Sequence, residues 1–221
     1  MNISKTELTE YLTNPNRYIQ EINDVAENWD KYNTLVNLII SQNEPRFQWS
    51  DELVELYRNT TLYFLGNRAT IFDLNKGLYI HGSPGSGKSL ILRFIYKFFT
   101  GRLGVNSYRV VLHSDIIQNA TKNGIIAIND YVRTNDKPIT LLIDDFGAGN
   151  RHISNYGNQI DVFTELIALR YNDFKRYGTL THITSNIKPH DIKTEFDERI
   201  SSRLSEMCNR VKFPNIDHRK L

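Results

Sequence analysis

The sequence of 221 residues has little of what stabilises secreted, zinc-binding or membrane proteins. Its single cysteine, Cys208, excludes an internal disulfide and any cysteine-rich zinc site, and we expect it in the core. The six histidines show no ligand spacing, so no histidine-based metal site is predicted. No apolar run approaches the roughly 20 residues that cross a bilayer, and the segment Met1–Glu7 has no apolar signal core. We therefore expect a cytoplasmic protein without a membrane partner.

The charge of the chain is unevenly distributed, although its net value is only +2. Residues 1–70 contain six Lys and Arg and ten Asp and Glu, whereas residues 71–221 contain 21 and 15. This split favours two parts with different partners, the basic part being suited to phosphates, but two ordinary solvated surfaces explain it equally well. The length and the 40% hydrophobic content predict one core domain, residues 71–221, and a small N-terminal module, residues 1–70.

The N-terminal module is predicted to be helical. Apolar residues at helical spacing form one face, namely Tyr32, Leu35, Val36, Ile39 and Ile40. The pairs Asn14-Pro15 and Ser50-Asp51 consist of residue types that begin helices.

From residue 77 onwards, predicted strands alternate with predicted helices. Short apolar or β-branched runs predict five strands, over residues 77–81, 109–113, 139–143, 180–184 and 210–213. Helices are predicted over residues 90–99, 115–132 and 160–174, the last being ended by Gly178. This alternation predicts an α/β fold, in which helices flank both faces of a five-stranded parallel sheet.

The segment Gly82–Ser89 fits the pattern G-x-x-x-x-G-K-[ST] and lies between a predicted strand and a predicted helix. Glycines let the backbone wrap a phosphate chain with its N–H groups directed inward. We therefore expect a P-loop that binds ATP. The expected binding residues are Gly82, Ser83, Pro84, Gly85, Ser86, Gly87, Lys88, Ser89 and Leu90. In this motif the lysine contacts the β- and γ-phosphates and the final hydroxyl, here Ser89, ligates Mg²⁺.

An apolar strand followed by two carboxylates, Asp144 and Asp145, has the Walker B pattern. Asp144 is predicted to hold Mg²⁺, and Asp145 to orient and deprotonate the attacking water. The next strand ends in Thr184-Ser185-Asn186, and Asn186 is predicted to contact the γ-phosphate or that water.

Two arginines, Arg199 and Arg203, are four residues apart on one face of a predicted helix. An arginine that reaches the γ-phosphate of a neighbouring subunit stabilises the charge of the transition state. Arg203 is the preferred candidate for this arginine finger, and Arg199 is the alternative. A solvated or salt-bridged helix face is the simpler explanation.

The order of these motifs resembles the AAA+ ATPases, and more narrowly the DnaC/DnaI helicase loaders and the IstB transposition helpers. Further segments are similar to that group, namely Asp144–Gly147, Tyr156–Asn158, Arg170-Tyr171, Thr184–Asn186, Arg199–Arg203 and Asp217–Lys220. The resemblance covers residues 70–221 and implies a core without the C-terminal helical lid of most AAA+ proteins. The use of aspartate at position 145 gives a shorter carboxylate than the glutamate common in AAA+ proteins.

The resemblance implies an ATPase that acts on DNA. The leading hypothesis is loading of a replicative helicase onto single-stranded DNA by a homo-oligomer that hydrolyses ATP across its subunit interfaces. In that reading the acidic N-terminal module docks the helicase and the basic core holds the DNA backbone. An ATPase that assists a DNA transposase and an ATP-binding assembly module with negligible turnover are the alternatives.

Overall fold

The computed structural model describes residues 36–37, 40–41, 44–64, 66–92, 108–155 and 158–218. The chain divides into two compact units. One contains residues 75–84 and 108–215, and the other contains the segments before and between these, together with residues 216–221. In the described part of the chain, no helix is long and apolar enough to cross a membrane.

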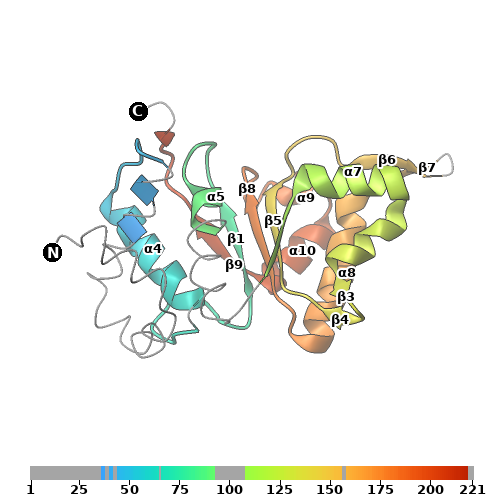
Figure 1. The fold of residues 1–221 in the computed structure, drawn as a ribbon, viewed down its shortest axis with the longest axis horizontal. Helices are drawn as coiled ribbons and strands as arrows, with labels where there is room; N and C mark the ends of the chain where they lie inside the picture. Colours follow the sequence, from blue (N-terminus) through green and yellow to red (C-terminus); the bar gives the residue numbers. More distant parts are fainter. Residues whose placement is uncertain are drawn as a thin grey trace. The chain divides into compact units, whose positions relative to one another are not determined.

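The larger unit, residues 75–84 and 108–215, is built on a five-stranded parallel sheet (Figure 1). Its strands are β1 (Gly77–His81), β2 (Arg109–Leu112), β5 (Leu141–Phe146), β8 (Thr181–Ser185) and β9 (Cys208–Lys212). Their order across the sheet is β2-β5-β8-β1-β9, and all neighbours are parallel. The predicted five-stranded parallel sheet is therefore confirmed, with β1 where it was predicted and the boundaries of the other four strands shifted by one to three residues. The third strand continues through Asp144 and Asp145 to Phe146, and the fifth begins at Cys208.

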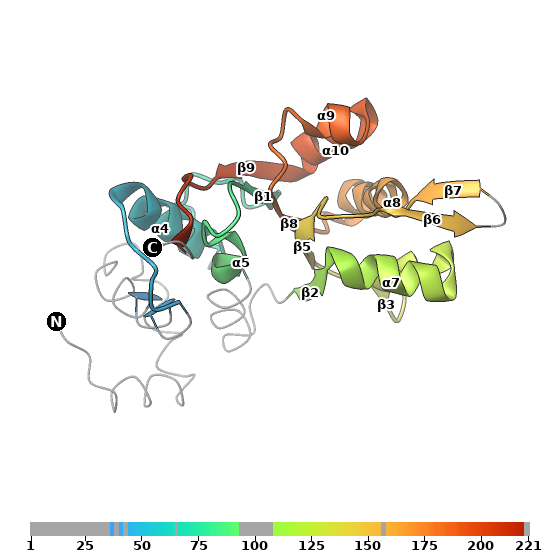
Figure 2. The ribbon, with the colours of Figure 1, turned by 90° about the horizontal axis from the view of Figure 1, so that it is seen from above.

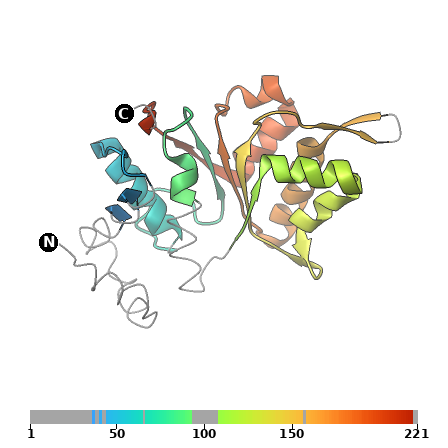
Figure 3. The same cartoon turned by 45° about the horizontal axis from the view of Figure 1, so that its top comes forward.

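Helices of the same unit cover one face of the sheet (Figures 1 and 3). They are α7 (His113–Asn123), the 3₁₀ helix η2 (Ile125–Tyr131), α8 (Val162–Tyr177), α9 (Ile192–Glu195) and α10 (Glu198–Met207). Sheet residues such as Tyr79, Ile143 and Ile183 form one buried cluster with side chains from these helices. The helical stretch predicted over residues 115–132 is confirmed, but Gly124 divides it into α7 and η2. Cys208 is buried in the same cluster, as expected.

Two short hairpins were not predicted from the sequence. Strands β3 (Arg133–Thr134) and β4 (Lys137–Pro138) form one, and strands β6 (His152–Asn155) and β7 (Asn158–Asp161) form the other. Figure 2 shows the β6–β7 hairpin projecting beyond the start of α8. Ile160 belongs to this hairpin and not to the predicted helix, which begins at Val162. Asp161 caps that helix, because its carboxylate accepts the N–H groups of Phe163 and Thr164.

Arg170 on α8 is a fully buried charge that joins several loops of this unit. Its guanidinium donates to Thr181 Oγ1 at 2.9 Å and to the carbonyl oxygen of Ile139 at 2.6 Å, and also to that of Leu180. Burial lowers the pKa of Arg170 to about 10, so the side chain remains protonated at neutral pH. These bonds hold the segments that enter β5 and β8. Arg170, one of the residues that resemble the DnaC/DnaI and IstB group, therefore has a structural role.

In the second unit, helix α4 (Asp51–Phe64) begins where the sequence predicts. The Ser50 hydroxyl accepts the N–H of Leu53 at 3.3 Å, which is an N-cap bond. Of the apolar face predicted over residues 32–40, the structure describes Val36 and Ile40, and both are buried in helical turns. The predicted helix start at residues 14–15 and most of the helix predicted over 90–99 lie outside the described residues.

Gly77 lies at a point in the sheet where a side chain should not be tolerated. A Cβ added there would lie 1.8 Å from the backbone oxygen of Thr181. We expect Gly77→Ala to lower the free energy of unfolding by about 3 kcal/mol or more, because β1 and β8 must separate to admit the methyl group. Gly178→Ala is the control, since it has a positive φ of +67° but nothing within 4 Å, and should cost about 1 kcal/mol. Urea unfolding followed by circular dichroism measures both, and equal losses would contradict the close approach.

Candidate functional site

Asp144, Asp145 and Asn186, together with the first P-loop residue, Gly82, lie at the carboxyl ends of three adjacent strands. Because β8 lies between β1 and β5, the ends of these strands reach the same edge of the sheet. The N–H of Gly82, the first residue of the P-loop, donates to the carbonyl oxygen of Ser185 at 3.4 Å. The Ser185 hydroxyl in turn donates to the carbonyl oxygen of Phe146 at 2.7 Å. The start of the P-loop and the end of the Walker B strand are thus fixed to the same residue.

Thr184 connects the two carboxylate residues of the Walker B strand. Its buried hydroxyl donates to the carboxylate of Asp144 and accepts the backbone N–H of Asp145 at 2.9 Å. Asp144 is itself only 1% exposed, whereas Asp145 is exposed. The arrangement gives the pair two different environments: one carboxylate is held inside the sheet edge and the other faces outward.

Asp145 has an unusual backbone, with φ at +57°. The pairing of β5 with β8 shifts register between Ile143 and Phe146, which marks a β-bulge. A bulge redirects the side chain of the extra residue, and bulges are frequent next to active sites. Aspartate tolerates the left-handed region better than most residues, at a cost of about 1–2 kcal/mol. The local strain at Asp145 is therefore consistent with a chemical role for its carboxylate.

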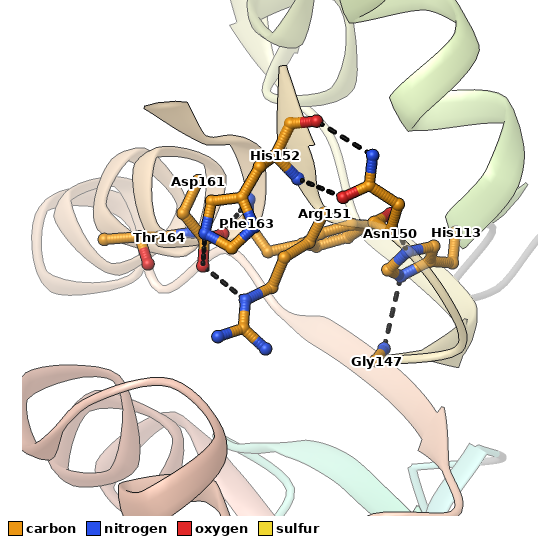
Figure 4. A network of polar contacts seen from close by, with 8 residues as sticks. All are labelled: His113, Gly147, Asn150, Arg151, His152, Asp161, Phe163 and Thr164. Atoms are coloured by element: carbon orange, nitrogen blue, oxygen red, sulfur yellow. Dashed lines mark hydrogen bonds and ion pairs between the residues drawn. The ribbon is translucent and has the colours of Figure 1, made fainter. Parts of the chain in front are cut away.

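The loop that follows Asp145 is held by His113 (Figure 4). His113 Nδ1 accepts the N–H of Gly147 at 3.2 Å, and its Nε2 lies 3.0 Å from the carbonyl oxygen of Asn150. This pairing requires the neutral ring with the proton on Nε2. Burial lowers the pKa of His113, which favours that neutral form, and the ring stacks on Phe163.

Farther along the same loop, Arg151 donates to the carboxylate of Asp161 at 2.6 Å (Figure 4). The loop is therefore tied at both of its ends, by His113 at one and by the α8 cap residue Asp161 at the other. Sequence reasoning did not identify this support, because these partners are separated by 34 and 10 residues along the chain.

The second half of the P-loop, residues 85–89, belongs to the other unit and has the backbone that its glycines predict. Gly85 and Gly87 have positive φ values of +77° and +94°. The carbonyl oxygen of Gly85 accepts the N–H of His218 at 3.1 Å, and the His218 ring stacks on Phe47 at 4.1 Å. A Cβ on Gly87 would meet the Phe47 ring at 3.0 Å. The C-terminal segment thus braces the loop.

The P-loop residues fit a bound triphosphate. The Ser86 hydroxyl is fully buried and has no hydrogen-bond partner among the described residues, which is costly unless a ligand or water supplies one. Lys88 is only 5% exposed. Hydroxyl and carboxylate oxygens are ligands that Mg²⁺ takes together with phosphate oxygens, and each unit offers one of them, the Ser89 hydroxyl in one and the Asp144 carboxylate in the other. Within the described residues, no group of three or more His, Cys, Asp or Glu side chains could hold a metal without such a ligand.

The remaining predicted residues are placed as follows. Asn186 is exposed, one residue beyond the end of β8. Arg199 and Arg203 both lie on α10, which Asp197 caps through the N–H of Ile200 at 2.7 Å. Arg199 is exposed, whereas the guanidinium of Arg203 stands 5.6 Å from the centre of the Tyr171 ring.

Thr184 is the residue that sequence reasoning underrated, since it selected the neighbouring Asn186. We expect Thr184→Val to lower stability by about 1–3 kcal/mol, because the Asp145 N–H loses its acceptor and the Asp144 carboxylate loses a donor. ATP turnover should fall at least about tenfold as both carboxylates lose their positions. Thr184→Ser, which keeps the hydroxyl, is the matched control in the same unfolding and phosphate-release assays. Equal turnover in the two variants would show that the hydroxyl is dispensable.

Several solved structures share the fold of this chain. The chain matches the crystal structure of DnaI with a TM-score of 0.54 and 19% identity, covering 76% of this chain and 85% of that one. It matches domain III of the Thermotoga maritima replication initiation protein DnaA with a TM-score of 0.53 and 21% identity, covering 80% and 69%. It matches the DnaC helicase loader with a TM-score of 0.50 and 18% identity, covering 76% and 93%. The resemblance predicted from the motifs is thus confirmed at the level of the fold.

Comparison by sequence gives no further assignment. No protein-family model matches the chain, and no curated protein matches it significantly.

Proposed function

We propose that this chain is a Mg²⁺-dependent ATPase that assists DNA replication by loading a replicative helicase. The observation that carries the proposal is the shared sheet edge. There the first P-loop residue bonds to Ser185, and the neighbouring Thr184 holds the two Walker B aspartates. The fold shared with DnaI and the DnaC helicase loader supports the choice of replication.

In the proposed reaction each residue has a separate task. The P-loop backbone and Lys88 bind the phosphate chain, and Asp145 orients the attacking water and accepts its proton. Asn186 contacts the γ-phosphate or the water, and an arginine of α10 from a second copy approaches the γ-phosphate. Ser89 and Asp144 are the residues proposed to hold Mg²⁺, which would neutralise phosphate charge if bound. Arg203, whose guanidinium stands 5.6 Å from the centre of the Tyr171 ring, is the proposed finger, and the exposed Arg199 is the alternative.

The ATPase proposal is tested on the full chain with ATP, Mg²⁺ and single-stranded DNA. We expect calorimetry to detect ATP binding and a phosphate-release assay to detect turnover that DNA accelerates. ATP binding without turnover in either condition would favour an assembly module.

The helicase partner is tested separately, by co-purification of the full chain with the replicative helicase in the presence of ATP. Retention that is lost after hydrolysis supports loading and release. Retention of a transposase in place of the helicase would assign the chain to transposition.

A further inference from the structure

A half-exposed tyrosine, Tyr177, is the last residue of α8 and has two guanidinium groups beside its ring. The guanidinium carbon of Arg176 stands 5.2 Å from the centre of the ring, and that of Arg133, on β3, stands 5.7 Å from it. Both distances are within the range of a cation–π contact. Figure 1 shows the β3–β4 hairpin beside the end of α8, and all three residues belong to one unit of the chain. We call Arg133, Arg176 and Tyr177 the tyrosine platform.

A buried carboxylate fixes the Arg133 guanidinium in this platform. Asp173 accepts a hydrogen bond from Arg133 Nη2 at 2.6 Å and another from its Nε at 3.3 Å. The Asp173 side chain is only 4% exposed, whereas that of Arg133 is 42% exposed. Asp173 and Tyr177 are four residues apart on α8, so they lie on one face of the helix and the same arginine contacts both. Arg133 is therefore pre-organised beside the ring while part of it faces solvent.

Arg176 supplies the one positive charge of the platform that no carboxylate offsets. In the described part of the chain, its guanidinium has no ion-pair partner within 4.0 Å, whereas Arg133 is paired with Asp173. The turn between β3 and β4 adds two exposed charges of opposite sign, Asp136 and Lys137. The platform is therefore suited to a single anionic group beside an aromatic ring.

The surroundings of Tyr177 do not suit a protein interface, because such interfaces enclose their aromatic and arginine anchors in an apolar core. Among the described residues, the other exposed large apolar side chains are Ile71 and Ile126, and neither lies on α8 or on the hairpin. An isolated ring beside guanidinium groups is instead suited to a single-stranded nucleic acid. A base stacks on the ring or on a guanidinium plane, and the charge contacts the backbone. A duplex keeps its base faces covered and cannot use such a platform.

We propose that the tyrosine platform binds one nucleotide of single-stranded DNA, with its base stacked on the platform and its phosphate paired with Arg176. The platform lies at the amino ends of the strands, because the hairpin precedes β5 and Tyr177 precedes β8. The Walker B aspartates and Asn186 lie at the carboxyl ends of the same strands. The five residues of β8 span about 16 Å, so the platform is separate from these residues. The inference takes its choice of DNA from the proposed function but requires no bound ATP.

Binding of a fluorescein-labelled oligothymidylate to the full chain, measured by fluorescence anisotropy without nucleotide, tests the stacking. Tyr177→Ala should weaken binding about tenfold, because one base loses its stacking partner. Tyr177→Phe is the matched control, since it keeps the ring, and should bind within about twofold of wild type. Binding of a duplex of the same length should not change in either variant.

The phosphate contact is tested by the salt dependence of the same binding. Arg176→Gln should lower the slope of log affinity against log salt concentration by about 0.7, the value for one phosphate of a single strand. Arg210→Gln, which removes an exposed arginine of β9 outside the platform, is the control and should leave the slope unchanged. Arg133 is kept in all variants, because its loss would leave the buried Asp173 carboxylate unpaired.

Equal affinities of Tyr177→Ala and Tyr177→Phe would overturn the stacking, and equal slopes of Arg176→Gln and Arg210→Gln would overturn the phosphate contact. Unchanged oligonucleotide affinity in Tyr177→Ala, with loss of the helicase in co-purification, would overturn the inference and assign the platform to a protein partner. Circular dichroism checks the folding of each variant.

Calorimetry with ATP and Mg²⁺ separates this inference from the proposed function. Tyr177→Ala should bind ATP as wild type does, because the platform lies at the other edge of the sheet. A wild-type chain that binds ATP but no oligonucleotide would refute the platform alone. A chain that binds the oligonucleotide but no ATP would instead refute the proposed ATPase and leave the platform in place.

Discussion

Replacement of Asp145 by asparagine is expected to stop ATP turnover while leaving ATP bound. The amide keeps the size of the side chain but cannot accept the proton of the attacking water, so turnover should fall by about 10²–10⁴. ATP affinity should stay within about threefold of wild type, because the side chain faces outward at the end of β5. Phosphate release measures the first quantity and calorimetry the second.

Asparagine is the appropriate substitution because of the backbone at this position. Asparagine tolerates the φ of +57° nearly as well as aspartate does, whereas alanine adds backbone strain of about 1–2 kcal/mol. With alanine, a loss of turnover could not be separated from a loss of structure. A variant that retains more than a third of the wild-type turnover would remove Asp145 from the role of general base. The adjacent Asp144 would not replace it readily, since that carboxylate is buried and bonded to Thr184.

Lys88→Ala should abolish ATP binding at concentrations where wild type is saturated. Lys88 is only 5% exposed and follows Gly87, whose φ of +94° turns the loop. Loss of a charge-assisted contact to two phosphates corresponds to a fall in affinity of about 100-fold or more. Calorimetry or a fluorescent ATP analogue measures this loss.

Lys122→Ala, a change of an exposed lysine in the last turn of α7, serves as the control and should leave ATP affinity unaltered. Comparable ATP affinity in the Lys88 and Lys122 variants would refute the P-loop assignment, whatever the likeness in fold. Because the Lys88 side chain is buried, thermal unfolding of both variants must accompany the binding measurement.

The strands of the sheet could be predicted from the sequence, and the candidate site residues could be chosen from it, because each depends on a local signal. An apolar run such as residues 141–143 predicts a strand without reference to the rest of the chain. A complete P-loop pattern likewise identifies a phosphate-binding loop by itself. The bulge at Asp145 was missed since it depends on how β5 meets β8, which lie 40 residues apart along the chain. The role of Thr184 follows from the same pairing. No local pattern distinguishes its hydroxyl from that of Ser185.

A cavity of about 690 Å³ at the carboxyl ends of β1, β8 and β9, which Lys188 and Lys212 help to line, illustrates the same limit. Lys188 and Lys212 belong to segments that follow different strands, and the sequence gives no indication that they line one space. Their charges were counted in the basic half of the chain but could not be placed. Strand order, which is a tertiary property, brings them together at one edge.

The strand order also constrains how the protein is made. In the sheet, β1 is paired with β8 and β9 alone, and both are formed by residues beyond 180. During synthesis β2 and β5 can associate as soon as residue 146 has emerged, but β1 must wait for strands about 100 residues later. Pairings of such high sequence separation form slowly. An apolar strand awaiting its neighbours on the ribosome is vulnerable to aggregation, and a chaperone that shelters nascent chains should raise the soluble yield.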